Sequence, residues 1–71
     1  MEAIKVSVVV PVYNVDEFLD NTLSDITGQT LREIEIICVD DGSTDNSCKI
    51  IEEWMEKDSR IQLIRQKNQY A

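Results

Sequence analysis

Three short apolar segments alternate with two longer segments of helical periodicity, and this order constrains the fold more than any other feature. The apolar segments are residues 6–10, 34–39 and 61–64, and they are rich in β-branched side chains. Near-continuous apolar runs are typical of parallel strands, whereas strands that are half exposed alternate polar and apolar residues. The order therefore predicts an α/β fold, a Rossmann-like βαβαβ unit with parallel strands. Right-handed crossovers place both helices on one face of the sheet and give the strand order 3-2-1.

Each helical segment carries one apolar stripe, which is the mark of a helix that packs on a sheet. The first stripe consists of Leu19, Thr22, Leu23 and Ile26. The second stripe consists of Cys48, Ile51, Trp54 and Met55. The spacing predicts that Trp54 is a core residue and not part of a binding site.

The ends of both helices also have sequence signals. Asn14 or Asp16 is expected to cap the first helix, and Gly28 is expected to end it. For the second helix, Asp45 occupies the expected cap position and Lys57 lies in the last turn.

Charge and composition exclude several classes of protein. The chain has 71 residues, with 14 acidic and 7 basic side chains and a formal net charge of -7. Nucleic acids and anionic membranes attract clustered Lys and Arg, so no nucleic-acid partner is expected. No apolar stretch is long enough for a transmembrane segment or a signal peptide. Without a secretory context, Cys38 and Cys48 are expected to be reduced packing residues of a cytoplasmic protein.

Glycine is too scarce, and histidine is absent, for several common nucleotide-binding, catalytic and metal sites. The only glycines are Gly28 and Gly42, so neither a GxGxxG dinucleotide fingerprint nor a P-loop is possible. The chain has no histidine, which excludes a His-based catalytic triad and a His metal site.

Two polar clusters follow the first and second predicted strands. They span residues 11–14 (PVYN) and 40–45 (DDGSTD). In an open α/β sheet, ligands bind beyond the carboxyl ends of the strands, so the clusters are expected to meet at one crevice. Tyr13 offers an aromatic face for a planar base. Asp41 offers a carboxylate for an N–H or a hydroxyl, and Gly42 can adopt a positive φ.

Simpler interpretations of the same residues stay open. The segment Asp-Asp-Gly-Ser is common in turns and helix caps, where Ser43 and Asp45 would accept from the free amides of the second helix. Tyr13 could equally lie at the rim of the first helix. The case for a binding site depends on the two clusters lying together.

The order of these segments resembles the start of the family-2 glycosyltransferases of the GT-A fold. The resemblance covers residues 5–71 and is carried by VSVVVPVYN, by the segment DNTLSDITGQTLREIEIICVDDGSTDNS and by KDSRIQLIRQKNQ. It identifies residues 1–71 as the N-terminal nucleotide-binding part of such a domain. It implies transfer of a sugar from a nucleotide diphosphate sugar, often a UDP-sugar, with inversion at the anomeric carbon.

The resemblance also implies roles for individual residues. Pro11 and Tyr13 would line the base pocket, with Tyr13 stacked on the base. Asp41 would accept a hydrogen bond from the base, and Asp40 would support the loop or the ribose. The loops themselves would be shaped by Asn14, Gly42, Ser43 and Asp45. Gln29 and Thr30 match a motif at the end of the family's first helix.

The expected catalytic machinery lies outside these residues. Family members carry an Asp-x-Asp motif that holds Mn²⁺ or Mg²⁺ and a later acidic general base, and neither matches a position in residues 1–71. The chain alone is therefore expected to be inactive, with no catalytic or metal-binding residue, and to self-associate through an exposed sheet face. A full-length enzyme would be cytoplasmic or peripheral to the inner membrane. The alternatives are a non-catalytic nucleotide-binding module and, more remotely, a phosphoacceptor domain, in which the acidic pair would follow the first strand.

Overall fold

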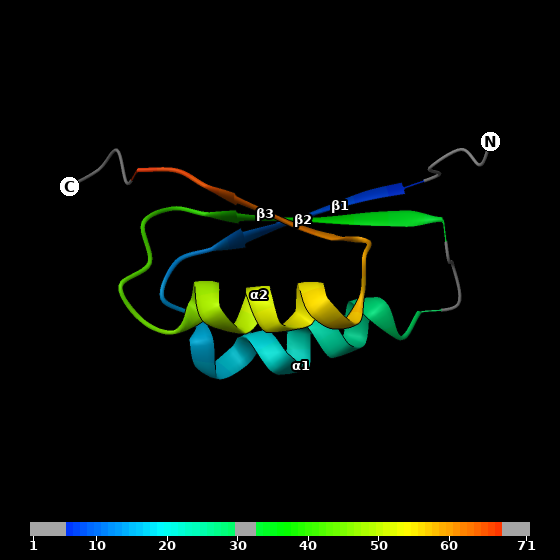
Figure 1. Cartoon of the computed structure of the whole chain (residues 1–71), viewed down its shortest axis with the longest axis horizontal. Helices are drawn as coiled ribbons and strands as arrows, with labels where there is room; N and C mark the ends of the chain where they lie inside the picture. The colour runs from blue at the N-terminus through cyan, green and yellow to red at the C-terminus, as the bar shows by residue number, and fades with distance from the viewer. Residues whose placement is uncertain (1–5, 30–32, 68–71) are drawn as a thin grey trace.

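The computed structural model describes residues 6–29 and 33–67, and within them it has the predicted order βαβαβ. The strands are β1 (Val6–Val12), β2 (Ile34–Asp40) and β3 (Ile61–Arg65). The helices are α1 (Asp16–Thr27) and α2 (Ser47–Lys57). All strands are parallel in the order β1-β2-β3, so the predicted α/β class and strand order are confirmed (Figure 1).

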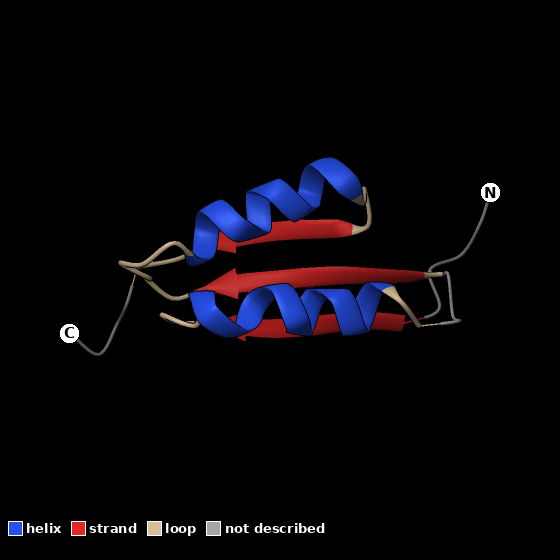
Figure 2. Ribbon diagram, turned by 90° about the horizontal axis from the view of Figure 1, so that it is seen from below, coloured by secondary structure: helices blue, strands red, loops and turns tan. Residues whose placement is uncertain are grey.

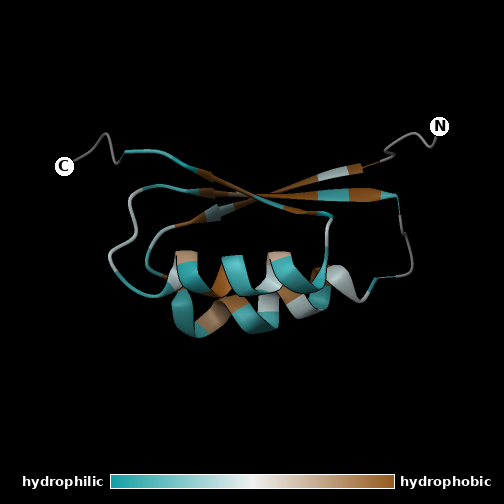
Figure 3. Ribbon diagram, in the orientation of Figure 1, coloured by the Kyte–Doolittle hydropathy of each residue, from teal (hydrophilic) through white to brown (hydrophobic). Residues whose placement is uncertain are grey.

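Both helices cover the same face of the sheet, as right-handed crossovers require (Figure 2). The side chains of Ile34, Ile36 and Cys38 alternate along β2 toward this face and are buried. The helices contribute Leu23 and Ile51, which have no exposed surface. Each such side chain stabilises the fold by about 1.5–3 kcal/mol through burial. Apolar residues accordingly dominate the strands, and polar residues cover the outside of the helices (Figure 3).

The opposite face of the sheet carries exposed apolar side chains. Val9 on β1 is 61% exposed, and Ile64 on β3 is 49% exposed. Exposed apolar surface of this kind favours association with another protein surface. Self-association through this face stays a prediction. Neither helix of the described part has the length and hydropathy needed to cross a bilayer.

The expected cap of α1 is wrong, whereas Asp45 lies one residue before the cap position of α2 and accepts from the first amide of that helix, as expected. The residues at the cap positions are Val15 for α1 and Asn46 for α2, and neither makes a side-chain cap hydrogen bond. At α1 the reason is that the amides of Val15 and Asp16 bond to side chains at the start of α2 and just before it, as described below.

The expected helix ends are right. Gly28 ends α1, and its amide donates to the carbonyl of Ser24 over 3.0 Å. Lys57 is the last residue of α2.

Trp54 is only partly a core residue. It packs against the buried cluster from α2, but the edge of its ring reaches the surface. There its Nε1 donates to Asp20 Oδ1 of α1 over 2.9 Å, and the Lys57 ammonium lies 5.1 Å from the ring centroid. The prediction that both cysteines are free is confirmed: Cys38 is buried, and Cys48 is half-buried.

Candidate functional site

The carboxyl ends of β1 and β2 lie side by side, which brings the two polar clusters together. Val12 and Asp40, the last residues of the two strands, are register partners. The amide of Asp41 then donates to the carbonyl of Val12 over 2.9 Å. The loops after both strands consequently leave the sheet at the same edge (Figure 1).

A pocket of about 400 Å³ opens at this edge. Its polar and aromatic lining consists of Tyr13, Asp41 and Gln66, and Pro11 with valines of the two strands and of the first loop completes it. Tyr13 is 51% exposed and lines the pocket, so part of its side chain is accessible to a ligand. An aromatic face beside a carboxylate can bind a flat ring that carries an N–H donor.

Asp40 does not line this pocket, because its side chain is buried and only 2% exposed. Its Oδ2 accepts from the amide of Ser43 over 3.2 Å. Within the described residues its Oδ1 has no hydrogen-bond partner, and the thiol of Cys48 lies near this carboxylate. Burial raises the pKa of Asp40, but the donors of Ser43, Cys48 and Gly42 outweigh it and hold the pKa below its ordinary value.

Two residues in the loops adopt the left-handed backbone conformation. Gly42 has φ 83°, so the predicted positive φ is confirmed, and the chain turns sharply after Asp41. Asn14 has φ 50°, which is uncommon for a residue other than glycine. Both turns lie next to the residues that line the pocket, so they set the directions in which Tyr13 and Asp41 leave the sheet.

Asn14 and Ser43 join the two loops directly. The amide of Asn14 donates to Ser43 Oγ over 3.0 Å. In return, Asn14 Oδ1 accepts from the amide of Thr44 over 2.8 Å. Ser43 therefore satisfies an amide of the first loop, and not an amide of α2 as expected from the sequence.

A second set of hydrogen bonds joins the starts of the two helices. Ser47 Oγ accepts from the amide of Val15 over 3.1 Å. Asp45 accepts from the amide of Asp16 over 3.1 Å with Oδ2 and from the amide of Ser47 over 2.9 Å with Oδ1. Asp16 Oδ2 accepts from the amide of Asn46 over 3.2 Å. Burial raises the pKa of Asp45, but its bonds with Ser47 and Asp16 dominate and lower it.

Sequence reasoning missed Gln66 and Ser47. Gln66 follows β3 at the carboxyl edge of the sheet and lines the pocket, and its amide donates to the carbonyl of Asp40 over 2.8 Å. The sequence signal for Gln66 is its position directly after an apolar strand, where ligand-binding residues of parallel sheets lie. Ser47 gave no signal of its own, since a serine at the start of a helix is usually a local cap.

Residues 7–71 match the family model described as glycosyl transferase family 2. The chain belongs to glycosyl transferase family 2.

Individual members of the family agree with this assignment. The glycosyltransferase GlyG of Streptococcus pneumoniae is 48% identical over 63 residues, which cover 89% of this chain and 21% of that protein. The glycosyltransferase GlyA of the same organism is 50% identical over 64 residues, covering 90% of this chain and 9% of that protein. This chain therefore spans about a fifth or less of the length of these relatives.

A solved structure shares the fold. It is the mannosyltransferase PcManGT from Pyrobaculum calidifontis in complex with GDP-Man and Mn²⁺. The TM-score is 0.76 with 25% sequence identity, over 97% of this chain and 21% of that chain. The likeness confirms the GT-A-type, Rossmann-like architecture expected from the sequence.

The resemblance to family 2 implies that Mn²⁺ or Mg²⁺ binds to the full-length enzyme. The residues described in this structure do not suit a metal ion. Residues 6–29 and 33–67 contain no group of three or more His, Cys, Asp or Glu side chains that could hold one. Of the acidic pair, Asp40 is enclosed and bonded to Ser43, and only Asp41 faces the pocket. No metal ligand is assigned to these residues.

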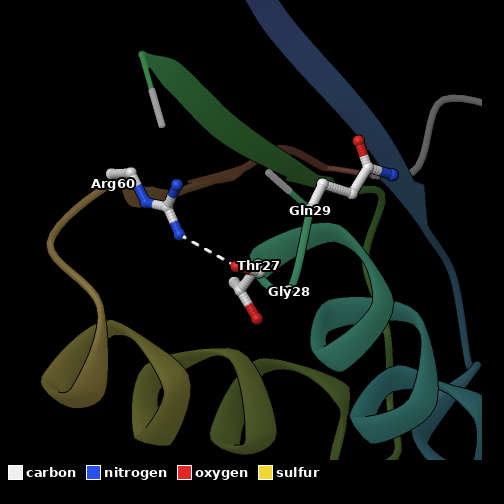
Figure 4. Close-up of a pocket in the computed structure, with 4 residues that line it drawn as sticks. All are labelled: Thr27, Gly28, Gln29 and Arg60. Atoms are coloured by element: carbon white, nitrogen blue, oxygen red, sulfur yellow. Dashed lines mark hydrogen bonds between the residues drawn. The ribbon is translucent and has the colours of Figure 1, made fainter. Parts of the chain in front are cut away.

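A larger pocket of about 510 Å³ lies at the opposite edge of the sheet (Figure 4). It is lined by Thr27, Gly28, Gln29 and Arg60. The Arg60 guanidinium is already engaged, because it contacts Asp58 at 2.7 Å and donates to the carbonyl of Thr27 over 3.3 Å. Ligands of open α/β sheets bind at the carboxyl edge, so this pocket is not the family site. Thr30, which was matched to a helix-end motif together with Gln29, lies outside the described residues.

Proposed function

We propose that this chain forms the base-binding part of the donor site in a glycosyltransferase that uses a nucleotide diphosphate sugar. The observation that carries the proposal is the pocket at the carboxyl edge of β1 and β2, where the exposed ring of Tyr13 lies beside Asp41. The family membership of residues 7–71 supports it. The GDP-Man in the mannosyltransferase PcManGT supports a nucleotide sugar as the donor class.

Each lining residue has a specific task in this proposal. Tyr13 stacks on the base, and Pro11 forms a rigid apolar wall of the same pocket. Asp41 accepts a hydrogen bond from a base N–H, which is a charge-assisted bond of about 1.5–3 kcal/mol. Asp40 holds the loop instead of contacting the ribose, because its carboxylate is enclosed.

We propose a UDP-sugar as the donor. Uracil presents one ring N–H, and a single carboxylate of Asp41 faces the pocket to accept it. The pocket volume of about 400 Å³ is near the lower end for small-molecule sites, which favours the smaller base. A diphosphate is repelled by a chain of net charge -7, so a divalent cation bound elsewhere in the enzyme is expected to offset that repulsion.

Nucleotide binding can be measured by titrating UDP into the ¹⁵N-labelled 71-residue chain and following amide chemical shifts, with GDP in a parallel titration. We expect shifts concentrated at Tyr13 and Gly42. Asp41→Asn should weaken UDP binding about tenfold through loss of a charged acceptor. Asp25→Asn is the matched control, since Asp25 is an exposed carboxylate on α1 and should not affect binding.

Substitutions of the aromatic residue test the stacking role separately. Tyr13→Phe keeps the ring and should retain binding, whereas Tyr13→Leu removes the flat face and should weaken it about tenfold. Equal affinities for UDP in the wild type and Asp41→Asn would remove Asp41 from the base site. Tighter binding of GDP than of UDP would replace the donor by a GDP-sugar.

A further inference from the structure

The amides just before and at the start of α1 bond to side chains that lie about thirty positions later in the chain. These are the successive amides of Asn14, Val15 and Asp16, which lead into α1, and the first amides of a helix have no preceding helical carbonyl as acceptor. Their acceptors are Ser43 Oγ at 3.0 Å, Ser47 Oγ at 3.1 Å and Asp45 Oδ2 at 3.1 Å. We name these bonds, with the two returning bonds described next, the inter-loop clamp.

The clamp acts in both directions. Asn14 Oδ1 accepts from the amide of Thr44 over 2.8 Å, and Asp16 Oδ2 accepts from the amide of Asn46 over 3.2 Å. Each loop therefore supplies acceptors for the backbone of the other. Displacing one loop relative to the other breaks hydrogen bonds in both directions. The two loops are therefore expected to move as one unit.

Tyr13 lies between two fixed points. Val12 before it belongs to β1, and its carbonyl accepts from the amide of Asp41. Asn14 after it is the first residue held by the clamp. Because the ring of Tyr13 is half exposed, few packing contacts hold it. Its position relative to Asp41 then depends on the backbone on either side.

We propose that Ser47 and Asp45 are positioning residues for nucleotide binding, which fix Tyr13 relative to Asp41 without touching the ligand. Ser47 has no exposed surface, so it cannot reach a molecule in the pocket. Both carboxylate oxygens of Asp45 are occupied by backbone amides. Neither residue lines the pocket. This inference rests on the proposed function; it adds Ser47 and gives Asp45, already expected to shape the loop, a role in nucleotide affinity through its bonds to the backbone.

The test compares three variants of the 71-residue chain. Ser47→Ala removes the acceptor of the Val15 amide, and Asp45→Asn replaces one acceptor oxygen by an NH₂ group that faces an amide donor. Ile51→Val is the control, since it removes one methylene from the same buried face of α2, one turn after Ser47, and removes no hydrogen bond of the clamp. If Ser47→Ala does not fold, Asp45→Asn carries the test, because Asp45 is only half-buried.

Two measurements are made on each folded variant, well below its unfolding midpoint. The dissociation constant for UDP is expected to rise about fivefold in Ser47→Ala and in Asp45→Asn and to be unchanged in Ile51→Val. Hydrogen exchange at the Val15 amide is expected to accelerate about fivefold in Ser47→Ala relative to exchange at the core of β2. A merely stabilising role of Ser47 would lower the unfolding midpoint as Ile51→Val does and leave the dissociation constant unchanged.

The outcomes separate this inference from the function beneath it. Wild-type affinity for UDP in both loop variants would overturn the positioning role, and so would unchanged exchange at Val15 in Ser47→Ala. If the wild type binds neither UDP nor GDP, the proposed function fails. In that case the amide chemical shifts of Tyr13 and Asp41 test whether Ser47 positions these two residues. Chemical shifts that change in Ser47→Ala but not in Ile51→Val support this role, and unchanged chemical shifts refute it.

Discussion

Asn14 offers a sharp test of how the first loop is stabilised, because two opposing effects meet at one residue. Its backbone has φ 50°, in the left-handed region that glycine adopts at no cost and Asn tolerates better than most residues. Its side chain also accepts from the amide of Thr44 over 2.8 Å. Replacing Asn14 by Ala and by Gly removes the same hydrogen bond but changes the backbone cost in opposite directions.

The expected magnitudes follow from these two terms. Loss of the bond to Thr44 costs about 1 kcal/mol in both variants. Ala at a left-handed φ adds about 1 kcal/mol of strain, so Asn14→Ala should lose about 2 kcal/mol in free energy of unfolding. Gly removes the strain, but the greater conformational entropy of the unfolded chain lowers the free energy of unfolding by about 0.4–1 kcal/mol. Asn14→Gly should therefore lose about 1 kcal/mol in free energy of unfolding. Glycine should therefore be the better replacement.

Urea denaturation of both variants measures this order, and the melting temperature of a domain this size should shift about 4–8 °C per kcal/mol. Asn21 is the matched control, since it is an exposed asparagine within α1. There Ala should be more stable than Gly by about 1 kcal/mol, because helices favour Ala. The rank of Ala and Gly should thus reverse between the two positions. The same rank at both positions would refute the claim that backbone strain at Asn14 matters.

Three further predictions concern the core and one ion pair. Burial raises the pKa of the Cys38 thiol to about 11 from 9.0, so stability should be full below pH 9 and fall toward pH 11, because the unfolded thiol ionises first. Urea denaturation across this range should show a slope that Cys38→Val lacks; equal slopes would contradict it. The Arg60 guanidinium lowers the pKa of Asp58, so Asp58→Asn should lose up to about 1 kcal/mol at neutral pH, and this loss should disappear as the pH falls below the ordinary carboxyl pKa. Leu23→Ala, at a site with no exposed surface, should cost about 2–5 kcal/mol in the same assay, and a loss below 1 kcal/mol would show that the core of the sheet face closes around the gap.

The elements could be predicted from the sequence because each depends on local periodicity. The stripe that contains Leu23 and the near-continuous apolar run of β2 are readable from neighbouring residues alone. The acceptors at the start of α1 could not be predicted in this way. The acceptor of the Val15 amide is Ser47, which lies thirty-two positions away, and no local pattern at Val15 points to it. Polar groups in a loop pair with whatever the fold brings close, so the clamp depends on the packing of the two helices.

The different positions of Asp40 and Asp41 follow from their places along β2. Buried residues of β2 fall on every second position, and Asp40 continues this series by one residue beyond the apolar run. Strand alternation therefore predicts that Asp40 faces the helices and that Asp41 faces away from them. The resemblance to the family grouped the two together as nucleotide-binding residues. The structure brings only Asp41 to the pocket.

The same substitution at these adjacent positions should consequently have different effects. Asp40→Asn disturbs a buried acceptor and should cost about 1–3 kcal/mol in free energy of unfolding at neutral pH. Because the pKa of Asp40 is lowered on folding, its contribution is present above the ordinary carboxyl pKa and is lost as the pH falls through the folded value. The variant should therefore have a flatter stability profile in acid.

Asp41→Asn lies at a half-exposed position and should change stability by less than about 0.5 kcal/mol, while it weakens UDP binding. Urea denaturation at neutral and acidic pH, combined with the UDP titration, measures both effects on the same samples. Equal destabilisation by the two substitutions would contradict the separation of Asp40 from Asp41. So would an acid profile of Asp40→Asn that matches the wild type. If the separation holds, alternation along β2 assigns one carboxylate to support of the loop and leaves the other for the ligand.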